Sequence, residues 1–410
     1  QRDISAVGSD PLQSESMTAS QALVWMSQRL SPESVVFNMA HRFDLAGAVD
    51  PERFLSALRL LVAGSDALRT VFTEGDGEGR QQVLDHLEVD VPVVDLTTAA
   101  DPEAAAVAWM GQRAARVFDL SSCCHDSCLL QLGAAQWVWF FNVHHLVADA
   151  WSIALICRHL GNYYDALADG GSPTVESQPA FIDYRRHEQD WRESDAFLRA
   201  REYWQGKLDA GSGLVALYGR KGSRSHTASQ RLTLELGRER SERLNALALE
   251  PGFRALSPHL SRFNLLASIV FAFLHRVGDS PKLTLGAPAH NRPTHAFRET
   301  IGLFIETLPL NTEIDAGESL RSLHRKVAAE SQYFLRHAQP GCSSPELSRL
   351  YNVVFNYINT GFGRFGDTAM GSQLVHSGHI DSGHDLRVQV HDLAESGEYI
   401  VHFDCKEYTL

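Results

Sequence analysis

An aromatic run that leads straight into a helical pattern is the feature that most constrains the fold of this chain. Residues 137–141 are all aromatic or valine, which is typical of a strand covered on both faces. From Ile153 to Leu167 apolar side chains recur at spacings of three and four residues, as on one face of a helix. Further strands and helices alternate along the chain, which predicts α/β layers rather than a helical bundle or a β-sandwich.

Two adjacent histidines and an acid stand in the connection between that strand and helix: His144, His145 and Asp149. Because neighbouring strand residues point to opposite faces, we expect His145 on the side of Trp139 and His144 on the other side. Asp149 falls where a carboxylate can cap free helix amides or face a buried cation. A lone histidine near a strand end is more often a hydrogen-bonded core or surface residue than a catalyst, but this pair with its acid favours an active site.

Residues 144–152 resemble the HHxxxDG motif of the condensation domains of nonribosomal peptide synthetases, which belong to the chloramphenicol acetyltransferase-like superfamily. Further resemblances to that family's motifs occur in the expected order along nearly the whole chain. They lie at residues 20–25, 66–72, 181–204, 301–309 and 351–357. On this resemblance the sequence is identified as a member of the condensation-domain family.

The resemblance also implies an architecture. It implies an α/β fold of two chloramphenicol acetyltransferase-like subdomains in a V-shaped pseudo-dimer, with a central tunnel and the histidine motif near its midpoint. A polar connection near residues 170–180 is the expected boundary. We predict an N-terminal subdomain over residues 1–175, which carries the HHxxxD motif, and a C-terminal subdomain over residues 176–410.

Bulk properties narrow the function classes. The chain has 410 residues, enough for two or three domains, and 37 basic against 50 acidic side chains give a net charge of −13. Such a charge argues against nucleic-acid binding. The longest apolar run, residues 265–274, is too short to cross a bilayer and predicts a buried helix, and no secretion signal opens the sequence. We expect a cytoplasmic protein with no nucleic-acid or membrane partner.

The cysteines raise the question of a metal. The six cysteines fit reduced thiols, but the cluster of Cys123, Cys124, His125 and Cys128 invites interpretation as a zinc site. No second ligand pair lies nearby at finger-like spacing, and structural zinc needs four ligands. We therefore predict no metal site, and the absence of a phosphate-loop pattern indicates no nucleotide cofactor.

The residues of the motif suit acyl transfer, which needs a base, a donor for the developing oxyanion and exclusion of water. His145 suits the role of base, because a neutral imidazole with a pKa of about 6.5 accepts a proton at cellular pH. A backbone amide near the start of the helix, in the segment Ala150, Trp151 and Ser152, could stabilise the oxyanion, with or without help from the Ser152 hydroxyl. His144, on the other face, favours a structural hydrogen-bonding role.

The resemblance gives the remaining site residues. It implies that Asp149 forms a buried ion pair with an arginine of the second half, for which Arg292 is the candidate. The candidate catalytic set is thus His145, His144 and Asp149. Two residues depart from the family pattern: Ala150 stands where glycine is usual, and Glu306 replaces asparagine near the substrate tunnel. If residue 150 needed a positive φ, alanine would cost on the order of 1 kcal/mol, and otherwise its methyl narrows the site.

The leading hypothesis is a condensation enzyme of nonribosomal peptide or hybrid polyketide biosynthesis. It would transfer an acyl or peptidyl group from a carrier-protein thioester to an amine or hydroxyl, forming an amide or ester. Substrates would arrive on the phosphopantetheine arms of peptidyl or acyl carrier proteins, with no bound cofactor, and the acceptor would be a small molecule or carrier-bound. The alternatives are an acyltransferase that uses a soluble coenzyme A ester, and a catalytically degenerate module that recruits a partner.

Overall fold

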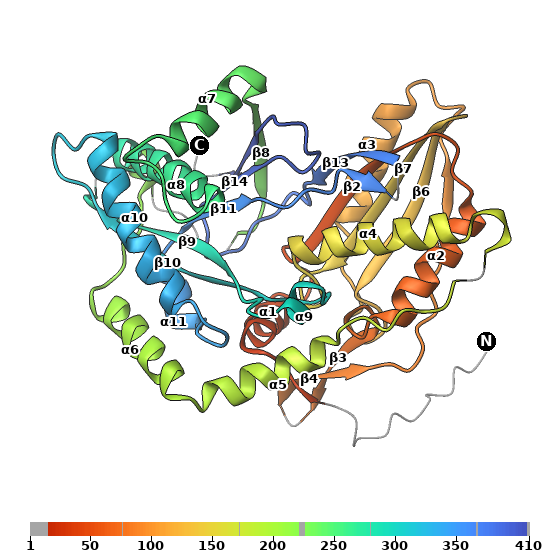
Figure 1. The fold of residues 1–410 in the computed structure, drawn as a ribbon, viewed down its shortest axis with the longest axis horizontal. Coiled ribbons are helices and arrows are strands. Elements are labelled where there is room, and N and C mark those ends of the chain that lie inside the picture. Colours follow the sequence, from red (N-terminus) through yellow and green to blue (C-terminus); the bar gives the residue numbers. More distant parts are fainter. Residues whose placement is uncertain are drawn as a thin grey trace.

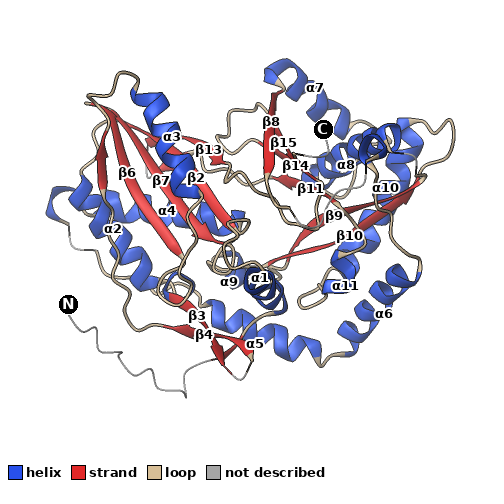
Figure 2. Ribbon diagram, turned by 180° about the vertical axis from the view of Figure 1, so that it is seen from behind, coloured by secondary structure: helices blue, strands red, loops and turns tan. Residues whose placement is uncertain are grey.

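The structure, a computed structural model, describes residues 15–75, 77–171, 173–220, 226–278, 280–365 and 368–407. Within these ranges the strands form two six-stranded sheets and one three-stranded sheet, and helices cover the large sheets (Figure 1, Figure 2). The prediction of an α/β fold is therefore confirmed.

The first large sheet has the strand order β12-β13-β2-β7-β6-β5. Its strands are β2 (Asn38–Ala46), β5 (Val93–Asp95), β6 (His125–Gly133), β7 (Gln136–His144), β12 (Arg364–Phe365) and β13 (Thr368–Val375). One face packs against the helices α2 (Pro51–Gly64) and α4 (Ala150–Ala166), and the other against α3 (Pro102–Ala114).

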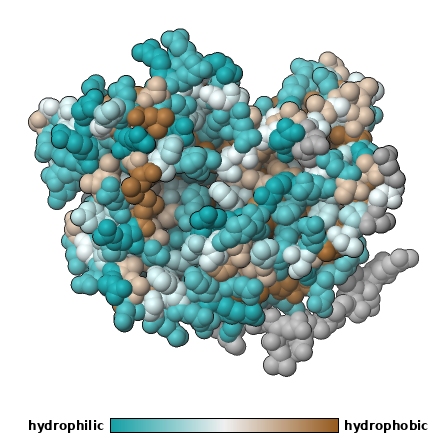
Figure 3. Space-filling view, in the orientation of Figure 1, coloured by the Kyte–Doolittle hydropathy of each residue, from teal (hydrophilic) through white to brown (hydrophobic). Residues whose placement is uncertain are grey.

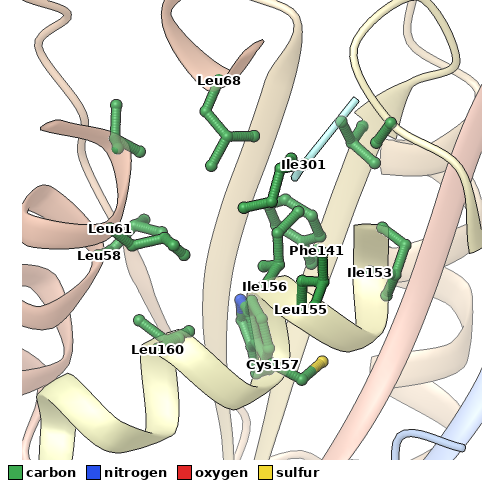
Figure 4. Packing of buried hydrophobic residues seen from close by; sticks show 14 of the residues in the cluster. Leu58, Leu61, Leu68, Phe141, Ile153, Leu155, Ile156, Cys157, Leu160 and Ile301 are labelled. Carbon is green, nitrogen blue, oxygen red and sulfur yellow. The ribbon is translucent and has the colours of Figure 1, made fainter. Parts of the chain in front are cut away.

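Alternation along β7 divides its side chains between two cores. Trp139 and Phe141 belong to the same apolar cluster as Ile156 of α4, whereas Phe140 clusters with Met110 of α3. Figure 4 shows Phe141 beside Ile156 in the first of these clusters. All but the first residue of β7 is buried, so this strand is covered on both faces, as its apolar run predicts.

One strand of this sheet comes from the far end of the chain. β13 pairs antiparallel with β2, from Met370 opposite Leu45 to Val375 opposite Ala40. The first sheet is therefore not built from residues 1–175 alone. The sequence could not predict this pairing, because pairing between distant strands leaves no local mark in sequence periodicity. The division of the chain into subdomains at residue 175 stays a prediction, and β12 and β13 cross it.

The second large sheet has the order β10-β9-β11-β14-β15-β8. Its strands are β8 (Ser229–Glu235), β9 (Lys282–His290), β10 (Ile305–Glu313), β11 (Val353–Ile358), β14 (Leu386–His391) and β15 (Ile400–Lys406). Its core includes apolar residues of α8 (Pro258–Val277) and α10 (Leu320–His337), and α7 (Gly237–Leu249) packs against α8.

Helix α8 contains the apolar run of residues 265–274 but is longer than that run. It spans 20 residues, so by length and composition it could cross a membrane. Half of its most apolar window is buried, however, and Phe271 and Leu274 lie in the core of the second sheet. The face seen in Figure 3 is mostly hydrophilic with small separate apolar patches. The contacts of Phe271 and Leu274 are those of a core helix.

The remaining elements include the strands β1, β3 and β4 of the three-stranded sheet. These elements are β1 (Glu15–Ser16), α1 (Ala19–Leu30), β3 (Thr70–Gly75), β4 (Glu78–Val83), α5 (Phe181–Arg192), α6 (Asp195–Asp209), α9 (His295–Arg298) and α11 (Pro345–Ser348), with 3-10 turns at Ala67–Arg69, Ala168–Gly170 and Leu217–Gly219. Helices α5 and α6 run along one side of the molecule from the first sheet toward the second (Figure 1). The carboxylate of Asp66 accepts hydrogen bonds from the amides of Phe181 and Ile182, at 2.9 and 3.0 Å, and so fixes the start of α5.

Candidate active site

The histidine pair lies where β7 ends, and the chain turns between the two residues. The amide of His144 donates to the carbonyl of Cys124, just before β6, at 2.8 Å, while the amide of His145 donates to the carbonyl of Phe37, just before β2, at 2.9 Å. The two backbones are therefore held from opposite neighbours, and the two rings face different surroundings.

His144 is enclosed. Its side chain is only 2% exposed, its Nδ1 accepts from the amide of Leu146 at 3.3 Å, and its ring lies against Phe37 and Phe118. Its Nε2 is 3.4 Å from Oε1 of Gln28. Burial lowers the pKa of His144 to about 3, so the ring is neutral. These contacts support a structural role.

His145 is the histidine of the pair that reaches open space. It is partly exposed and lines two neighbouring cavities, of about 250 and 460 Å³. Its Nδ1 is buried, so Nε2 is the ring nitrogen that could reach a ligand. Burial lowers the pKa of His145 below its usual value, and the charge of Asp149 opposes part of that shift. A neutral imidazole at an open junction can accept a proton.

The two cavities have different walls. Cavity 1, the smaller, lies between β2 and β13 of the first sheet and β11 and β14 of the second. Cavity 2 lies between α1, β10 and the segments around residues 343–351 and 381–384. The residues that line both cavities, and so mark their junction, are Phe37, His145, Ile305, Thr307, Asp381 and His384.

Asp149 holds the loop after the histidines. It is fully buried, caps α4 by accepting from the Ser152 amide at 2.8 Å, and pairs with Nη2 of Arg292 at 2.9 Å. Its other oxygen accepts from the amide of Phe304 at 3.1 Å. Burial alone would raise the pKa of Asp149, but the charge of Arg292 and these hydrogen bonds outweigh it and lower the pKa. The structure thus brings Asp149 and Arg292 together, and the pair links α4 to the second half of the chain.

Arg292 is itself fixed on several sides. Its Nη1 donates to the carbonyls of Phe297 and Thr300, at 2.7 and 2.6 Å, and its guanidinium lies 3.8 Å from the ring centre of Phe304. Its Nη2 also donates to Oγ of Ser152 at 2.9 Å. The guanidinium is therefore part of the scaffold behind the histidine loop.

The three residues after Asp149 differ in their surroundings. The hydroxyl of Ser152 is buried and donates to the carbonyl of Gly302 at 2.7 Å, so it is engaged away from both cavities. The Trp151 indole donates to the carbonyl of Arg298 at 2.8 Å. Ala150 is the member of this segment that lines cavity 1. It begins α4 without a positive φ, so its methyl narrows the cavity rather than straining the backbone.

Glu306 lines cavity 2, but its carboxylate is turned into a loop. The side chain is 2% exposed and accepts hydrogen bonds from the amides of Gly341 and Ser343. Burial raises the pKa of Glu306. A second buried acid, Glu188 of α5, lies nearby and accepts a hydrogen bond from the Ala19 amide at 2.7 Å. Sequence patterns gave no sign of it. Burial and the charge of Glu306 raise the pKa of Glu188 to about 7.

Other polar residues of the cavities also escaped sequence reasoning. Asp381 and His384 at the junction, and Arg231 and Arg387 in cavity 1, belong to none of the motif segments. They come from strands and loops that only the folded sheet brings together. Within the described ranges, no group of three His, Cys, Asp or Glu side chains is placed to hold a metal, and the cysteines there are unpaired thiols.

Comparison with known proteins identifies the family of the chain. The family model described as the condensation domain matches residues 13–344. Isonitrile lipopeptide synthase of Streptomyces coeruleorubidus is 29% identical over 324 residues, which is 78% of this chain and 21% of that protein. Across eight such relatives the chain spans between 4% and 24% of their length.

Solved structures match over nearly the whole chain. The first condensation domain of the CDA synthetase has a TM-score of 0.85 at 24% identity, covering 97% of this chain and 92% of that one. The starter condensation domain of rhizomide synthetase, solved as a mutant in complex with C8-CoA, has a TM-score of 0.83 at 25% identity, covering 96% and 90%.

Proposed function

Because the chain belongs to the condensation-domain family of nonribosomal peptide synthetases, we propose that it transfers an acyl or peptidyl group from a carrier-protein thioester to an amine or hydroxyl acceptor. The product is an amide or an ester. The observation that carries this proposal is the position of His145, which is partly exposed and lines both cavities. An imidazole there can meet two substrates that enter from different sides.

In the proposed reaction, Nε2 of His145 accepts the proton of the amine or hydroxyl as that group attacks the thioester carbonyl. A C–N or C–O bond forms, the tetrahedral oxyanion collapses, and the C–S bond breaks. The proton on His145 then passes to the leaving thiolate. Among residues 150–152, the backbone amide of Ala150 is the best supported oxyanion donor, because Trp151 and Ser152 line neither cavity.

Asp149 and Arg292 act in this proposal as positioning residues. Their ion pair is buried and holds the loop that carries His145, so they need not touch substrate. His144 supports the same loop from the other side through Leu146. The proposed catalytic set is therefore one base with three structural partners.

The two cavities together suggest how carriers would deliver substrates. We infer that they form the two arms of a central tunnel between two chloramphenicol acetyltransferase-like subdomains arranged as a V. Each phosphopantetheine arm would enter one cavity and bring its thiol end to the junction at His145. This arrangement requires a peptidyl or acyl carrier protein for the donor. It requires a second carrier protein only where the acceptor is not a free small molecule.

The proposal is tested with acyl-loaded carrier proteins and a panel of amine and alcohol acceptors, followed by intact-protein mass spectrometry. We expect wild-type protein to unload the carrier and form product, and His145→Ala to leave the carrier loaded. Equal background with both proteins would contradict the proposal.

A second candidate is an acyltransferase that takes its donor from a soluble coenzyme A ester. The complex of the similar starter condensation domain with C8-CoA favours it. The same assay separates the two, because a coenzyme A donor makes turnover independent of the carrier protein. If only free coenzyme A esters react, the carrier-based proposal is wrong.

The third candidate, a catalytically degenerate module that recruits a partner, draws on Ala150 and Glu306. Ala150 has ordinary helical geometry, and the Glu306 carboxylate is bound by the loop at residues 341–343. Neither departure obstructs His145, which weakens this candidate.

A further inference from the structure

Cavity 1 carries a positive group that the proposed reaction does not use. Arg387 of β14 lines this cavity, its side chain is 28% exposed, and its charge is close enough to lower the pKa of His145. It does not line cavity 2. The positive charge is thus on one side of the junction.

The hydrogen bonds of Arg387 leave part of the guanidinium free. Its Nε and Nη2 both donate to Oδ2 of Asp404, at 3.0 and 2.8 Å. Among the residues that the structure describes, Nη1 has no hydrogen-bond partner. A guanidinium edge with unused N–H groups at a cavity wall is suited to a carboxylate, which accepts such bonds strongly.

Asp404 cannot neutralise this charge alone, because it also binds a second arginine. Arg231 donates to its two oxygens through Nε and Nη2, at 2.7 and 3.0 Å, and through Nη1 to the carbonyl of Leu374 at 2.9 Å. All three nitrogens of Arg231 are engaged. Two guanidinium groups therefore share one fully buried carboxylate, and Arg387 is the one with capacity left.

A second polar group lies beside Arg387 on the same face of β14. Gln389 follows two residues later and lines the same cavity. Its side-chain oxygen is buried and has no partner within the described ranges. The amide nitrogen is not among the buried unpaired atoms, so its N–H groups can donate into the cavity as the side chain stands, and the wall offers two adjacent donors.

Asp381 is the negative group that opposes this assignment. It lines both cavities, which places it at the junction, and its Oδ1 accepts from the amide of Gly383 at 2.7 Å. Arg387 and Gln389, in contrast, line only cavity 1. An anion bound by both donors would therefore lie in the part of cavity 1 that β14 lines.

We propose that the substrate occupying cavity 1 carries a carboxylate, which Arg387 binds through Nη1 with help from Gln389. This specificity rests on the proposed function, and it holds whether the carboxylate belongs to the acyl donor or to the acceptor. A dicarboxylic acyl group or an amino acid acceptor would satisfy it.

The test measures kcat/KM for matched substrate pairs that differ in one charge. The donor arm compares glutaryl with pentanoyl thioesters on the same carrier, and the acceptor arm compares amino acids with their primary amides. We expect one arm to favour the carboxylate, and Arg387→Gln to reduce that preference about tenfold, as loss of a charge-assisted hydrogen bond predicts. Arg387→Lys should restore part of the preference.

Arg231→Gln is the matched comparison, because it leaves Asp404 to pair with Arg387 alone while Nη1 of Arg387 stays in place. It should therefore reduce the preference less than Arg387→Gln does. If Arg387→Gln lowers kcat/KM equally for both members of each pair, the residue is structural and the inference is wrong. The inference is equally wrong if neither arm favours a carboxylate.

A binding measurement separates this inference from the reaction itself. Ligand-observed NMR compares pentanoate with pentanamide on the wild-type chain and on Arg387→Gln. Pentanoate binding that depends on Arg387 supports the inference even if no turnover is found, in which case only the proposed function has failed. Equal signals from both compounds, or from both proteins, overturn it.

Discussion

The two cavities that meet at His145 are lined by different secondary-structure elements and different side chains. Cavity 1 is walled by strands of both large sheets and carries Arg231 and Arg387. Cavity 2 is walled by α1, whose Met26 and Leu30 are 58% and 78% exposed, and by the loop that binds Glu306. His145 lines both cavities, and the proposed function uses this difference between them to admit two unlike substrates.

The largest expected effect comes from the residue that both cavities share. His145→Gln should lower kcat by about 10²–10⁴-fold with every donor and acceptor, because it removes the general base. His384→Gln is the matched control, since His384 lines both cavities as well. Single-turnover kinetics with one loaded carrier compare the two. Equal losses from both variants would show that His145 has no special role at the junction.

The ion pair behind the junction should affect both cavities through the fold. Asp149→Asn leaves Arg292 buried with a weakened partner, and we expect a loss of about 3–5 kcal/mol in the free energy of unfolding. Urea denaturation measures it. In a double-mutant cycle with Arg292→Gln, the double variant should lose much less than the sum of the single losses. Additive losses would mean that the pair does not couple the two halves.

The buried acid Glu188, near Glu306 of cavity 2, should make the stability of the protein depend on pH. The pKa of Glu188 is raised to about 7 in the folded state from its ordinary 4.5, so folding favours the protonated form. Stability should fall as pH rises from 4.5 to 7, by roughly 2–3 kcal/mol, and then level off. Glu188→Gln should remove this dependence in denaturation curves taken across that range. An unchanged pH dependence in the variant would assign it to other groups.

The smallest effect is expected from the methyl group that narrows cavity 1. Ala150→Gly should cost less than about 1 kcal/mol of stability, because residue 150 is the first residue of α4. It should raise kcat/KM for bulkier substrates of cavity 1 and leave the size preference in cavity 2 as it is. A survey of acyl chain lengths and acceptor sizes checks this. A shift in both preferences would contradict the separate roles of the cavities.

Local sequence patterns predicted individual strands and helices better than they predicted which strands pair in a sheet. The apolar run before His144 is the doubly covered strand β7, and the helical spacing that starts at Ile153 belongs to α4, which ends at Ala166. The pairing of β13 with β2 could not be predicted, because it joins residues far apart in the sequence. Strand alternation does not orient His145, because β7 ends at His144 and the chain turns there.

The candidate site divides in the same way. The motif indicated the histidines and Asp149, and the resemblance to the family implied Arg292 as a partner. Arg387, Gln389 and Glu188 carry no local signal, because their importance depends on what the fold places beside them. In the sequence Arg387 is an ordinary charged residue of a strand. Its unused nitrogen is evident only from the hydrogen bonds that Arg387 and Arg231 donate to Asp404.

The pH dependence of single-turnover rates tests the role of His145 most directly. Burial lowers the pKa of His145 below its usual value, so the rate should be constant near neutral pH and fall as pH drops below the ordinary histidine range. This acidic decline should persist in His384→Gln and be absent from the residual rate of His145→Gln. An acidic decline that survives in His145→Gln and vanishes in His384→Gln would contradict the account and assign the base to the other imidazole.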